Sequence, residues 1–326
     1  MAPSMAFKNI RWAQPLLSLL ATLSVRMLCS KTGVATLAIL SLYLGARGCG
    51  SGAPLRVGTF NVREFGPSTD LGRLTALLAE SDADVMAVQE IQRPDLLPQV
   101  AKLLSAKSGR SYLSIASDCG GKRAMHVGFL FDAKRVKLDA VEEFPELRDD
   151  RGGSCSLGAR AGLLGVFSQR SWFRHREYAL LTVHFPAGGD VEQARERQLF
   201  WARALRIAAR VRDGGRERVL ILGDVNSTGY RENIYGERDS IHVAVKRAGF
   251  HLLTPDLRCT EYFQPPEHNA FLPSHLDHIV GSGAVSARGE PRVLSFCAAL
   301  RCAPTGTMPS DFAAVSDHCP VLLDVN

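Results

Sequence analysis

Apolar and polar positions alternate in blocks from residue 55 onward, and each block has the length of a single strand or helix. Residues 55–62 and 84–91 are short apolar runs of the kind that form buried strands. Between them, the polar residues Ser68 to Asp70 precede a stretch with leucines at helical spacing. A strand, a helix and a strand in this order predict a βαβ unit whose two strands run parallel.

The same order recurs in the second half of the chain. Residues 178–185 are a strand-like run, and the helical pattern that follows ends at Gly214 and Gly215. Residues 218–226 form a third strand that ends in polar side chains. Alternating segments of this kind predict one α/β domain, which we place at residues 50–326.

Two later apolar runs carry their acidic residues at the beginning instead of the end. These runs are residues 274–280 and residues 317–324. A strand that leaves an edge of a sheet begins where an arriving strand ends. We therefore expect both runs to lead away from the edge at which the earlier strands finish.

The strand ends carry the polar side chains of a candidate catalytic site, because open α/β sheets bind ligands at the carboxyl ends of their strands. The polar residues at the arriving ends are Asn61, Glu90, His184, Asp224 and Asn226. Asp277, Asp317 and His318 begin the two departing runs. The sequence therefore predicts that these side chains converge on one rim.

The residue types at this rim suit phosphoester hydrolysis, which needs a metal ion to neutralise phosphate oxygens and a base to activate water. Glu90 is the best metal ligand in this set, because Mg²⁺ and Mn²⁺ prefer oxygen ligands. His318 supplies a base, and Asp277 can hold its imidazole tautomer. A strand-end glutamate or a neighbouring His and Asp is common on protein surfaces, so each signal is weak by itself.

Six short blocks give a stronger signal together, because they follow one another in a fixed order. They are residues 59–62 (TFNV), 88–91 (VQEI), 183–184 (VH), 221–226 (ILGDVN), 274–279 (SHLDHI) and 316–321 (SDHCPV). In sequence and order they resemble the signature blocks of the endonuclease/exonuclease/phosphatase superfamily, and the resemblance covers residues 54–326. That superfamily includes pancreatic-type deoxyribonucleases, abasic-site endonucleases, neutral sphingomyelinases and inositol polyphosphate 5-phosphatases. The resemblance implies a DNase I-like fold, a four-layer α/β sandwich of two mixed β-sheets packed face to face with helices outside.

The resemblance also implies a divalent-metal site. By similarity, Glu90 holds Mg²⁺ with Asn61 close by, and Asp317 contributes near the metal or the phosphate. Mn²⁺ is the alternative ion. The chain is accordingly predicted to be an Mg²⁺-dependent phosphodiesterase.

Five further residues receive catalytic roles from the resemblance. His318 is implied to be the general base, or the residue that polarises the nucleophile, and Asp277 to orient it. Asp224 and Asn226 are implied to position the attacking water and to stabilise the charged phosphorane. His184 is implied to bind a phosphate oxygen or to assist the leaving group.

Three positions depart from relatives within that superfamily. Secreted deoxyribonucleases pair the first catalytic histidine with a glutamate, but residues 125–131 contain none, and His126 is the only substitute there. Abasic-site enzymes carry an acidic residue two positions after the asparagine, where this chain has Arg63. The side chain of the adjacent Glu64 would face the other way on a regular strand. Many members of the superfamily carry a lysine just after the first catalytic histidine, but residues 185–189, which follow His184, contain no lysine.

The N-terminus is predicted to be a targeting segment, residues 1–49. Its apolar stretch, residues 34–46, has the length of a signal-peptide core and is too short to span a bilayer. Met27 is an alternative start that would give a compact signal. Residues 44–49 resemble a lipoprotein box, so lipidation of Cys49 and plain secretion remain equal alternatives. Both place the protein outside the cytoplasm, either secreted or anchored to a membrane.

The overall charge gives little support for a broad nucleic-acid-binding face. The chain has 39 basic and 33 acidic residues, but five basic ones lie before residue 50, which leaves 34 against 33. Four arginines are candidates for phosphate contacts: Arg160, Arg195, Arg197 and Arg231. The favoured substrate is still a phosphodiester in DNA or RNA, cleaved by a monomeric enzyme.

Two other functions stay open at this point. A sphingomyelinase-like phospholipase C would need an exposed apolar loop, for which residues 262–266 and 270–272 are the candidates, although burial in the core explains them equally. A non-catalytic binding lipoprotein is the alternative from another class. We expect three polar loops, residues 142–160, 227–240 and 255–273, to surround the site and to carry its selectivity.

The chain has eight cysteines, which suits an oxidising compartment. Cys297 and Cys302 are close enough in sequence to staple a loop, and Cys119 is a possible partner for Cys155. The sequence does not fix this connectivity. We expect Cys319 to pack as a small apolar residue at the start of a strand.

Overall fold

The computed structural model describes residues 53–121, 123–147, 160–170 and 176–326, all within the unit Gly52–Asn326. The predicted targeting segment, residues 1–49, lies outside the described residues, and so does Cys155. None of the helices in the described part has the length and apolar character needed to cross a membrane.

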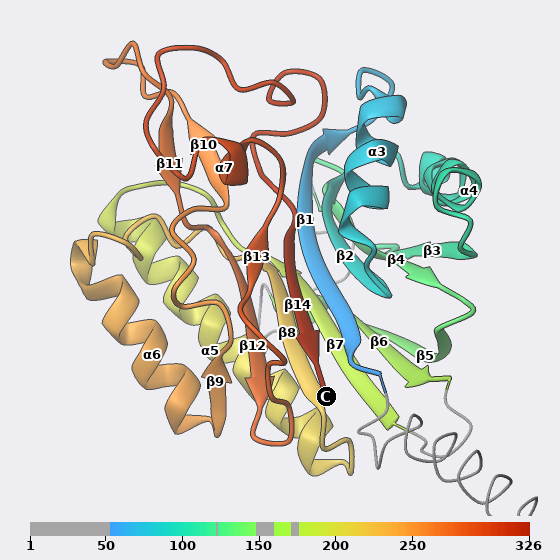
Figure 1. The fold of residues 1–326 in the computed structure, drawn as a ribbon. Helices are drawn as coiled ribbons and strands as arrows, with labels where there is room; N and C mark the ends of the chain where they lie inside the picture. The colour runs from blue at the N-terminus through green and yellow to red at the C-terminus, as the bar shows by residue number, and fades with distance from the viewer. Residues whose placement is uncertain (1–52, 122, 148–159, 171–175) are drawn as a thin grey trace, which may run out of the picture. The chain divides into compact units, whose positions relative to one another are not determined.

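Two six-stranded sheets form the centre of the fold (Figure 1). The first has the order β13 (Arg292–Val293), β14 (Val321–Val325), β1 (Leu55–Phe65), β2 (Val85–Ile91), β4 (His126–Asp132), β3 (Tyr112–Ala116). The second has the order β5 (Val136–Phe144), β6 (Gly162–Gln169), β7 (Arg176–His184), β8 (Val219–Asp224), β12 (Asp277–Ser282), β9 (Phe250–Leu252). In each sheet one neighbouring pair is parallel, β1 with β2 and β7 with β8, and the remaining pairs are antiparallel.

Helices cover the outer face of each sheet (Figure 1). Helices α3 (Leu71–Ser81) and α4 (Leu97–Ser108) pack on the first sheet, and α5 (Val191–Asp213) and α6 (Glu237–Arg247) pack on the second. Besides the two apolar layers between the helices and the sheets, a third lies between the two sheets. In it, Val57 and Phe129 of the first sheet pack with Phe167 and Leu222 of the second. This arrangement confirms the predicted four-layer α/β sandwich.

The helix boundaries follow from capping residues in the sequence. The Asp70 side chain accepts a hydrogen bond from the backbone N–H of Arg73 and caps α3. Asp190 caps α5 in the same way, by accepting from the first free N–H groups of that helix. Gly214 ends α5, as the sequence predicts.

The parallel strands β7 and β8 approach each other closely at Gly223. Its φ is 150°, and an added Cβ would lie 2.0 Å from the carbonyl oxygen of Val183. Only glycine fits such an approach. The pairing that results sets His184 directly beside Asp224 at the ends of the two strands.

The two departing runs are antiparallel to the arriving strands, as predicted, but their boundaries were wrong. The run at residues 274–280 is divided, because Ser274 ends β11 (Leu272–Ser274) and β12 begins only at Asp277. The run at residues 317–324 becomes β14 only from Val321. The break before β12 has a local cause, since Thr260 Oγ1 accepts hydrogen bonds from the backbone N–H groups of residues 276 and 277.

All three predicted loops contain regular structure. Residues 142–144 continue β5, a 3-10 turn follows at Pro145–Leu147, and residues 148–159 lie outside the described part. The range 227–240 includes the 3-10 turn Ile234–Gly236 and the start of α6. The range 255–273 includes β10 (Glu261–Phe263) and most of β11. The charge, proline and glycine content of these ranges hid the short strands, turns and helix start that they contain.

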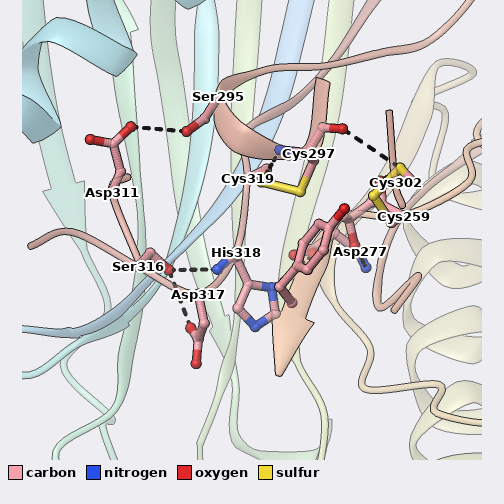
Figure 2. Close-up of a disulfide and its surroundings, with 12 residues drawn as sticks. Cys259, Asp277, Ser295, Cys297, Cys302, Asp311, Ser316, Asp317, His318 and Cys319 are labelled. Carbon is pink, nitrogen blue, oxygen red and sulfur yellow. Dashed lines mark hydrogen bonds and ion pairs between the residues drawn. A yellow bond between two sulfur atoms is a disulfide. The ribbon is translucent and has the colours of Figure 1, made fainter. Parts of the chain in front are cut away.

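A small cap beside the sheets is held by two disulfide bonds, Cys259–Cys302 and Cys297–Cys319 (Figure 2). We call the segments around these four cysteines, with helix α7 (Ser295–Ala299), the disulfide cap. Its buried apolar side chains are few: Tyr262, Phe271 and Phe296 join the cysteines.

The observed pairing corrects two expectations from the sequence. Cys297 does not bond to Cys302, and Cys319 is a disulfide partner instead of a simple apolar side chain. Partners distant in sequence meet because the cap folds across the start of β14, which spacing alone does not reveal. Cys119 is also disulfide-bonded, but its suggested partner Cys155 lies outside the described residues.

Candidate active site

Four strands of the two sheets end at one rim and bring polar side chains together. Asn61 lies near the end of β1 and Glu90 near the end of β2, while His184 and Asp224 end β7 and β8. Asn61 Nδ2 donates hydrogen bonds to Asp224 Oδ2 at 2.9 Å and to Glu90 Oε1 at 3.2 Å. These bonds join the first sheet to the second at the rim.

Asn226 follows β8 and completes the surroundings of Asp224. Its Nδ2 donates to Asp224 Oδ2 at 3.0 Å and to the Phe185 carbonyl oxygen at 3.1 Å. Its backbone N–H donates to Asp224 Oδ1 at 2.9 Å. Both oxygens of this buried carboxylate therefore accept hydrogen bonds, which fixes the orientation of the carboxylate plane.

The two departing segments supply a buried histidine and its carboxylate partner. His318 Nδ1 lies 2.8 Å from Asp277 Oδ2, and His318 Nε2 lies 3.8 Å from Asp224 Oδ2. With Nδ1 occupied by Asp277, Nε2 is the nitrogen turned toward the arriving strands. Figure 2 shows this pair next to the Cys297–Cys319 disulfide.

The backbone at this rim adopts conformations that are uncommon for residues other than glycine. Glu90 has φ 60° and Asn226 has φ 49°, and the neighbouring Arg63 and Glu64 have φ 34° and 49°. Such conformations persist where the surrounding structure holds them, and they concentrate at functional sites. The turn at Arg63 and Glu64 also breaks the regular strand, and the Glu64 backbone N–H donates to Glu90 Oε2 at 3.0 Å.

Burial and neighbouring charges shift the pKa values of His318 and Asp224 at the rim. Burial opposes the charged form of His318, but Asp277, Asp224 and Asp317 outweigh it and raise its pKa well above the ordinary value. Burial raises the pKa of Asp224 to about 7, although His318 acts against this shift. The raised pKa makes His318 a stronger base than an ordinary histidine, and it depends on the carboxyl groups that surround the ring.

The side chain that contacts His184 is an arginine, Arg160, and not the glutamate that the resemblance to secreted deoxyribonucleases would imply. Nη1 of Arg160 lies 2.8 Å from Nδ1 and 3.0 Å from Nε2 of His184. Burial lowers the pKa of His184 well below its ordinary value, and Arg160 strengthens that effect. His126 does not replace the glutamate, because its Nδ1 bonds to the Ser117 carbonyl oxygen at 2.7 Å.

Two groups of side chains at the rim have ligand atoms close enough to hold a metal ion. One group is Glu90, His184 and Asp224, and the other is Asp224, Asp277 and His318; in each, the ligand atoms lie within 4.8 Å of one another. The first group is rich in oxygen and includes the partly exposed Glu90, so it fits a hard divalent cation such as Mg²⁺ or Mn²⁺. Asn61 lies against this group through its bonds to Glu90 and Asp224.

Asp317 lies at the same rim but belongs to neither group. Its Oδ2 is 3.8 Å from Arg63 Nη1, and Ser316 Oγ donates to its Oδ1 at 3.4 Å. Arg63 in turn lies over the Phe312 ring. Position 63, which is acidic in abasic-site enzymes, thus carries an arginine whose guanidinium group faces Asp317.

Two supporting residues, Gln89 and Ser316, lie inside the signature blocks but received no role from the sequence. Gln89 accepts a hydrogen bond from Thr59 and donates one to Thr182, which links the two sheets beneath the site. Ser316 Oγ donates to the Asn61 carbonyl oxygen at 2.7 Å and accepts from the His318 backbone N–H. The bonds of Gln89 and the bond from Ser316 to Asn61 join residues far apart in sequence, so no local pattern predicts them.

The four arginines proposed for phosphate contacts lie in different settings. Arg160 is at the site, whereas Arg197 is buried in a salt bridge with Glu237 at 2.6 Å. Arg195 pairs with Glu192 on the exposed face of α5. Arg231 Nη1 donates to the Leu257 carbonyl oxygen at 3.1 Å. Arg197 is therefore a structural residue, and Arg160 is the member of these four, all in the described part of the chain, that contacts a predicted site residue.

Comparison with known proteins agrees with this architecture. Similar solved structures include a mannosyl-6-phosphatase from Bacteroides thetaiotaomicron, 17% identical, TM-score 0.56, covering 83% of this chain and 99% of that chain. The human Nocturnin catalytic domain with bound sulfate is 15% identical, TM-score 0.56, with 84% and 94% covered. D. rerio TDP2 in complex with a single-strand DNA product is 17% identical, TM-score 0.53, with 83% and 98% covered. No match was found among curated proteins.

A sequence model of one protein family matches residues 58–318, which include every predicted site residue from Asn61 to His318. That family is described as the Endonuclease/Exonuclease/phosphatase family, and its members hydrolyse phosphoesters. The match spans most of the chain and agrees with the fold. The chain therefore belongs to the Endonuclease/Exonuclease/phosphatase family of hydrolases.

Proposed function

We propose that this protein is a divalent-metal-dependent phosphodiesterase that cleaves DNA or RNA. The observation that supports this most directly is the meeting of two groups at one rim. Glu90, His184 and Asp224 form an oxygen-rich ligand group, and the His318–Asp277 pair lies against it through Asp224. A metal site next to an oriented histidine is the combination that phosphodiester hydrolysis requires.

Glu90 would hold the metal ion with Asn61 close by, and Asp317 would lie near the metal or the phosphate. A bound Mg²⁺ or Mn²⁺ supplies charge that neutralises the phosphate oxygens. The carboxylate of Glu90 is fixed for this purpose by hydrogen bonds from Asn61 and from the Glu64 backbone. Asp317 is the weakest member, because its carboxylate faces Arg63 and lies outside both ligand groups.

The remaining residues orient the attacking water and transfer protons. His318 accepts a proton at Nε2, or polarises the nucleophile through that atom, while Asp277 holds Nδ1. Asp224 and Asn226 fix the attacking water, and the hydrogen bonds to both oxygens of Asp224 keep its carboxylate in place. His184, kept neutral by burial and by Arg160, binds a phosphate oxygen or assists the leaving group.

Nucleic acid is our preferred substrate, although two alternatives must be tested with it. The structure of TDP2 with a DNA product shows that a similar fold accommodates single-stranded DNA. The lipid alternative requires an exposed apolar loop. Of the aromatic side chains in the two candidate loops, Tyr262 and Phe271 are buried and Phe263 is exposed, at 43%. A binding protein without catalysis would have no need for the oriented His318–Asp277 pair.

We also propose that the protein acts outside the cytoplasm as a monomer. An oxidising compartment would preserve the two disulfide bonds of the cap. Anchoring through lipidated Cys49 and free secretion are the two forms of this proposal. Mass spectrometry of the protein from its native source, with lipid-modified Cys49 or an unmodified processed end as the two outcomes, would separate them.

The substrate proposal is tested with a panel at fixed Mg²⁺ concentration. The purified protein is assayed on plasmid DNA, RNA, sphingomyelin and bis(p-nitrophenyl) phosphate, with the Glu90→Gln variant as a matched control. Cleavage of DNA or RNA by the wild type alone supports the proposal. Exclusive cleavage of sphingomyelin replaces it with the lipid alternative, and inactivity on the whole panel rejects phosphoester hydrolysis.

A further inference from the structure

Thr260 is a buried residue next to the rim to which neither the resemblance nor the proposed mechanism assigns a role. It directly precedes β10, and its exposed fraction is 0%. Its hydroxyl group and both of its backbone polar groups form hydrogen bonds to other segments of the chain. Two of these segments carry Asp277 and His318.

The hydroxyl group of Thr260 holds the backbone at the start of β12. Thr260 Oγ1 accepts hydrogen bonds from the backbone N–H groups of Leu276 and Asp277, each at 3.0 Å. The Thr260 N–H donates to the Ser274 carbonyl oxygen at 2.7 Å. Asp277 is therefore bonded to Thr260 at its own backbone N–H, and the chain just before it is bonded to Thr260 twice more.

The carbonyl oxygen of Thr260 holds the segment that carries His318. It accepts a hydrogen bond from the Cys319 backbone N–H at 2.8 Å. The next residue, Glu261, forms an isolated antiparallel bridge with His318. Thr260 is thus bonded both to Asp277 and to the direct neighbour of His318.

The backbone position of Asp277 matters because little else fixes its carboxyl group. One oxygen, Oδ2, lies 2.8 Å from His318 Nδ1. The other oxygen, Oδ1, is buried and has no hydrogen-bond partner among the described residues. A carboxyl group with a single partner is oriented by its own backbone and by that partner. A shift of the backbone at Asp277 would therefore move the carboxyl group relative to the imidazole ring.

Two buried N–H groups depend on the Thr260 hydroxyl group. Buried backbone N–H groups are almost always hydrogen-bonded, because an unpaired one has lost its bonds to water without a replacement. Removal of Oγ1 would therefore favour a shift of the backbone at residues 276 and 277 toward other acceptors. A misplacement of about 1 Å in an active site can lower a rate by about two orders of magnitude.

We propose that Thr260 is a positioning residue for the His318–Asp277 pair, and that its hydroxyl group and carbonyl oxygen fix the two side chains relative to each other. This inference rests on the proposed function, because it assumes that His318 and Asp277 act in phosphoester hydrolysis. Since Thr260 is fully buried, it acts through these two residues and not through the substrate. Its loss therefore affects the rate of turnover more than the binding of substrate.

The test compares Thr260→Val and Thr260→Ser with the wild type, with kcat, KM and Tm measured for hydrolysis of bis(p-nitrophenyl) phosphate in Mg²⁺. Valine has the shape of threonine without the hydroxyl group, whereas serine keeps the hydroxyl group. We expect Thr260→Val to lower kcat at least tenfold and to change KM less than threefold. Thr260→Ser should keep kcat within threefold of the wild-type value.

Thr254 provides the matched control, since it is also a threonine with an exposed fraction of 0%. Its Oγ1 accepts a hydrogen bond from another backbone N–H of β12, that of Ile279, at 3.0 Å. Ile279 lies two residues beyond Asp277, inside the strand. Thr254→Val should lower Tm, because it also leaves a buried N–H group unpaired, and should leave kcat close to the wild-type value.

The outcomes separate this proposal from the proposed function. An active wild type with an equally active Thr260→Val variant rejects the role of Thr260 alone. Equal losses of kcat in Thr260→Val and Thr254→Val also reject it, because they would show a general effect of lost stability. If Thr260→Val does not fold, a tenfold loss of kcat in a folded Thr260→Ser variant still rejects the role. An inactive wild type on every phosphoester rejects the proposed function, and the role of Thr260 with it.

Discussion

The two sides of the active rim are held in place by different kinds of structure. The arriving side, with Asn61, Glu90, His184 and Asp224, consists of the ends of four strands at the centre of the sandwich, and extended apolar layers support it. The departing side, with His318, is held against the disulfide cap, whose core contains few apolar side chains. Cys319, the neighbour of His318, is itself one half of a cross-link.

One site can therefore combine residues that are held by core packing with residues that are held by a disulfide bond. The arriving side carries the proposed metal ligands, whose positions follow from strand pairing and core packing. The departing side carries the oriented histidine, whose position depends on Thr260, on the bridge to Glu261 and on the Cys297–Cys319 bond. Damage to one side should therefore leave the other side folded, and the predictions below test that separation.

The largest effects should come from one substitution on each side. Glu90→Gln removes a proposed metal ligand and His318→Ala removes the proposed base, and each should lower kcat by about three orders of magnitude or more. The two should differ in metal affinity: Glu90→Gln should weaken Mn²⁺ binding in calorimetry, and His318→Ala should leave it nearly intact. Near-wild-type activity of either variant would reject the role of that residue.

Breaking one disulfide should have a smaller but selective effect. In the Cys297→Ser/Cys319→Ser double variant, His318 loses the cross-link next to it, so we expect kcat to fall at least tenfold. Mn²⁺ affinity and the cooperative unfolding of the two-sheet core should change little. The Cys259→Ser/Cys302→Ser variant is the control, because its cross-link lies farther along the chain from His318. Equal loss of metal binding and activity would show that the two sides are not separable.

The same difference explains what the sequence could reveal. The residues of the arriving side could be predicted from the sequence, because buried strands give continuous apolar runs. The polar residues at the ends of these runs are Asn61, Glu90, His184 and Asp224. The reversed direction of the departing strands was also readable, from the early positions of Asp277 and Asp317. The family resemblance then supplied the roles, since each residue alone gives a weak signal.

The structure of the departing side was predicted less completely from the sequence, because it depends on contacts between segments that are distant along the chain. The disulfide partners, 22 and 43 residues apart, follow from the folded cap and not from spacing. The burial of Glu261 beside His318 depends on a bridge between β10 and a segment that follows it by more than fifty residues. The contact between Arg160, which precedes β6, and His184 at the end of β7 likewise joins two separate segments.

Acid should weaken the departing side through two buried histidines next to Asp277. Burial lowers the pKa of His278 to about 3 and that of His275 well below its ordinary value, and the two rings stack with centroids 4.2 Å apart. The unfolded chain binds their protons near pH 6.5, so stability is lost as pH falls from there toward 3. At pH 5.5 the loss is about 1 kcal/mol for each histidine.

Comparing His278→Phe with the wild type isolates this effect, which is the smallest we predict. The raised pKa of His318 acts in the opposite direction and favours the folded protein at low pH, but it is common to both proteins. Chemical denaturation of metal-free protein at pH 7.5 and 5.5 should show a smaller loss of stability in the variant, by about 1 kcal/mol. Exposed His251, substituted in the same way, is the control. Parallel losses in the wild type and His278→Phe would contradict the prediction.

The central claim, that the rim is a metal-dependent phosphoesterase site, is tested most directly by metal removal and return. Hydrolysis of bis(p-nitrophenyl) phosphate by the purified protein is followed in Mg²⁺, then in excess EDTA, then after Mg²⁺ or Mn²⁺ is added back. We predict that EDTA abolishes hydrolysis and that the returned ion restores it in the wild type but not in Glu90→Gln. Hydrolysis that continues unchanged in EDTA would contradict the claim.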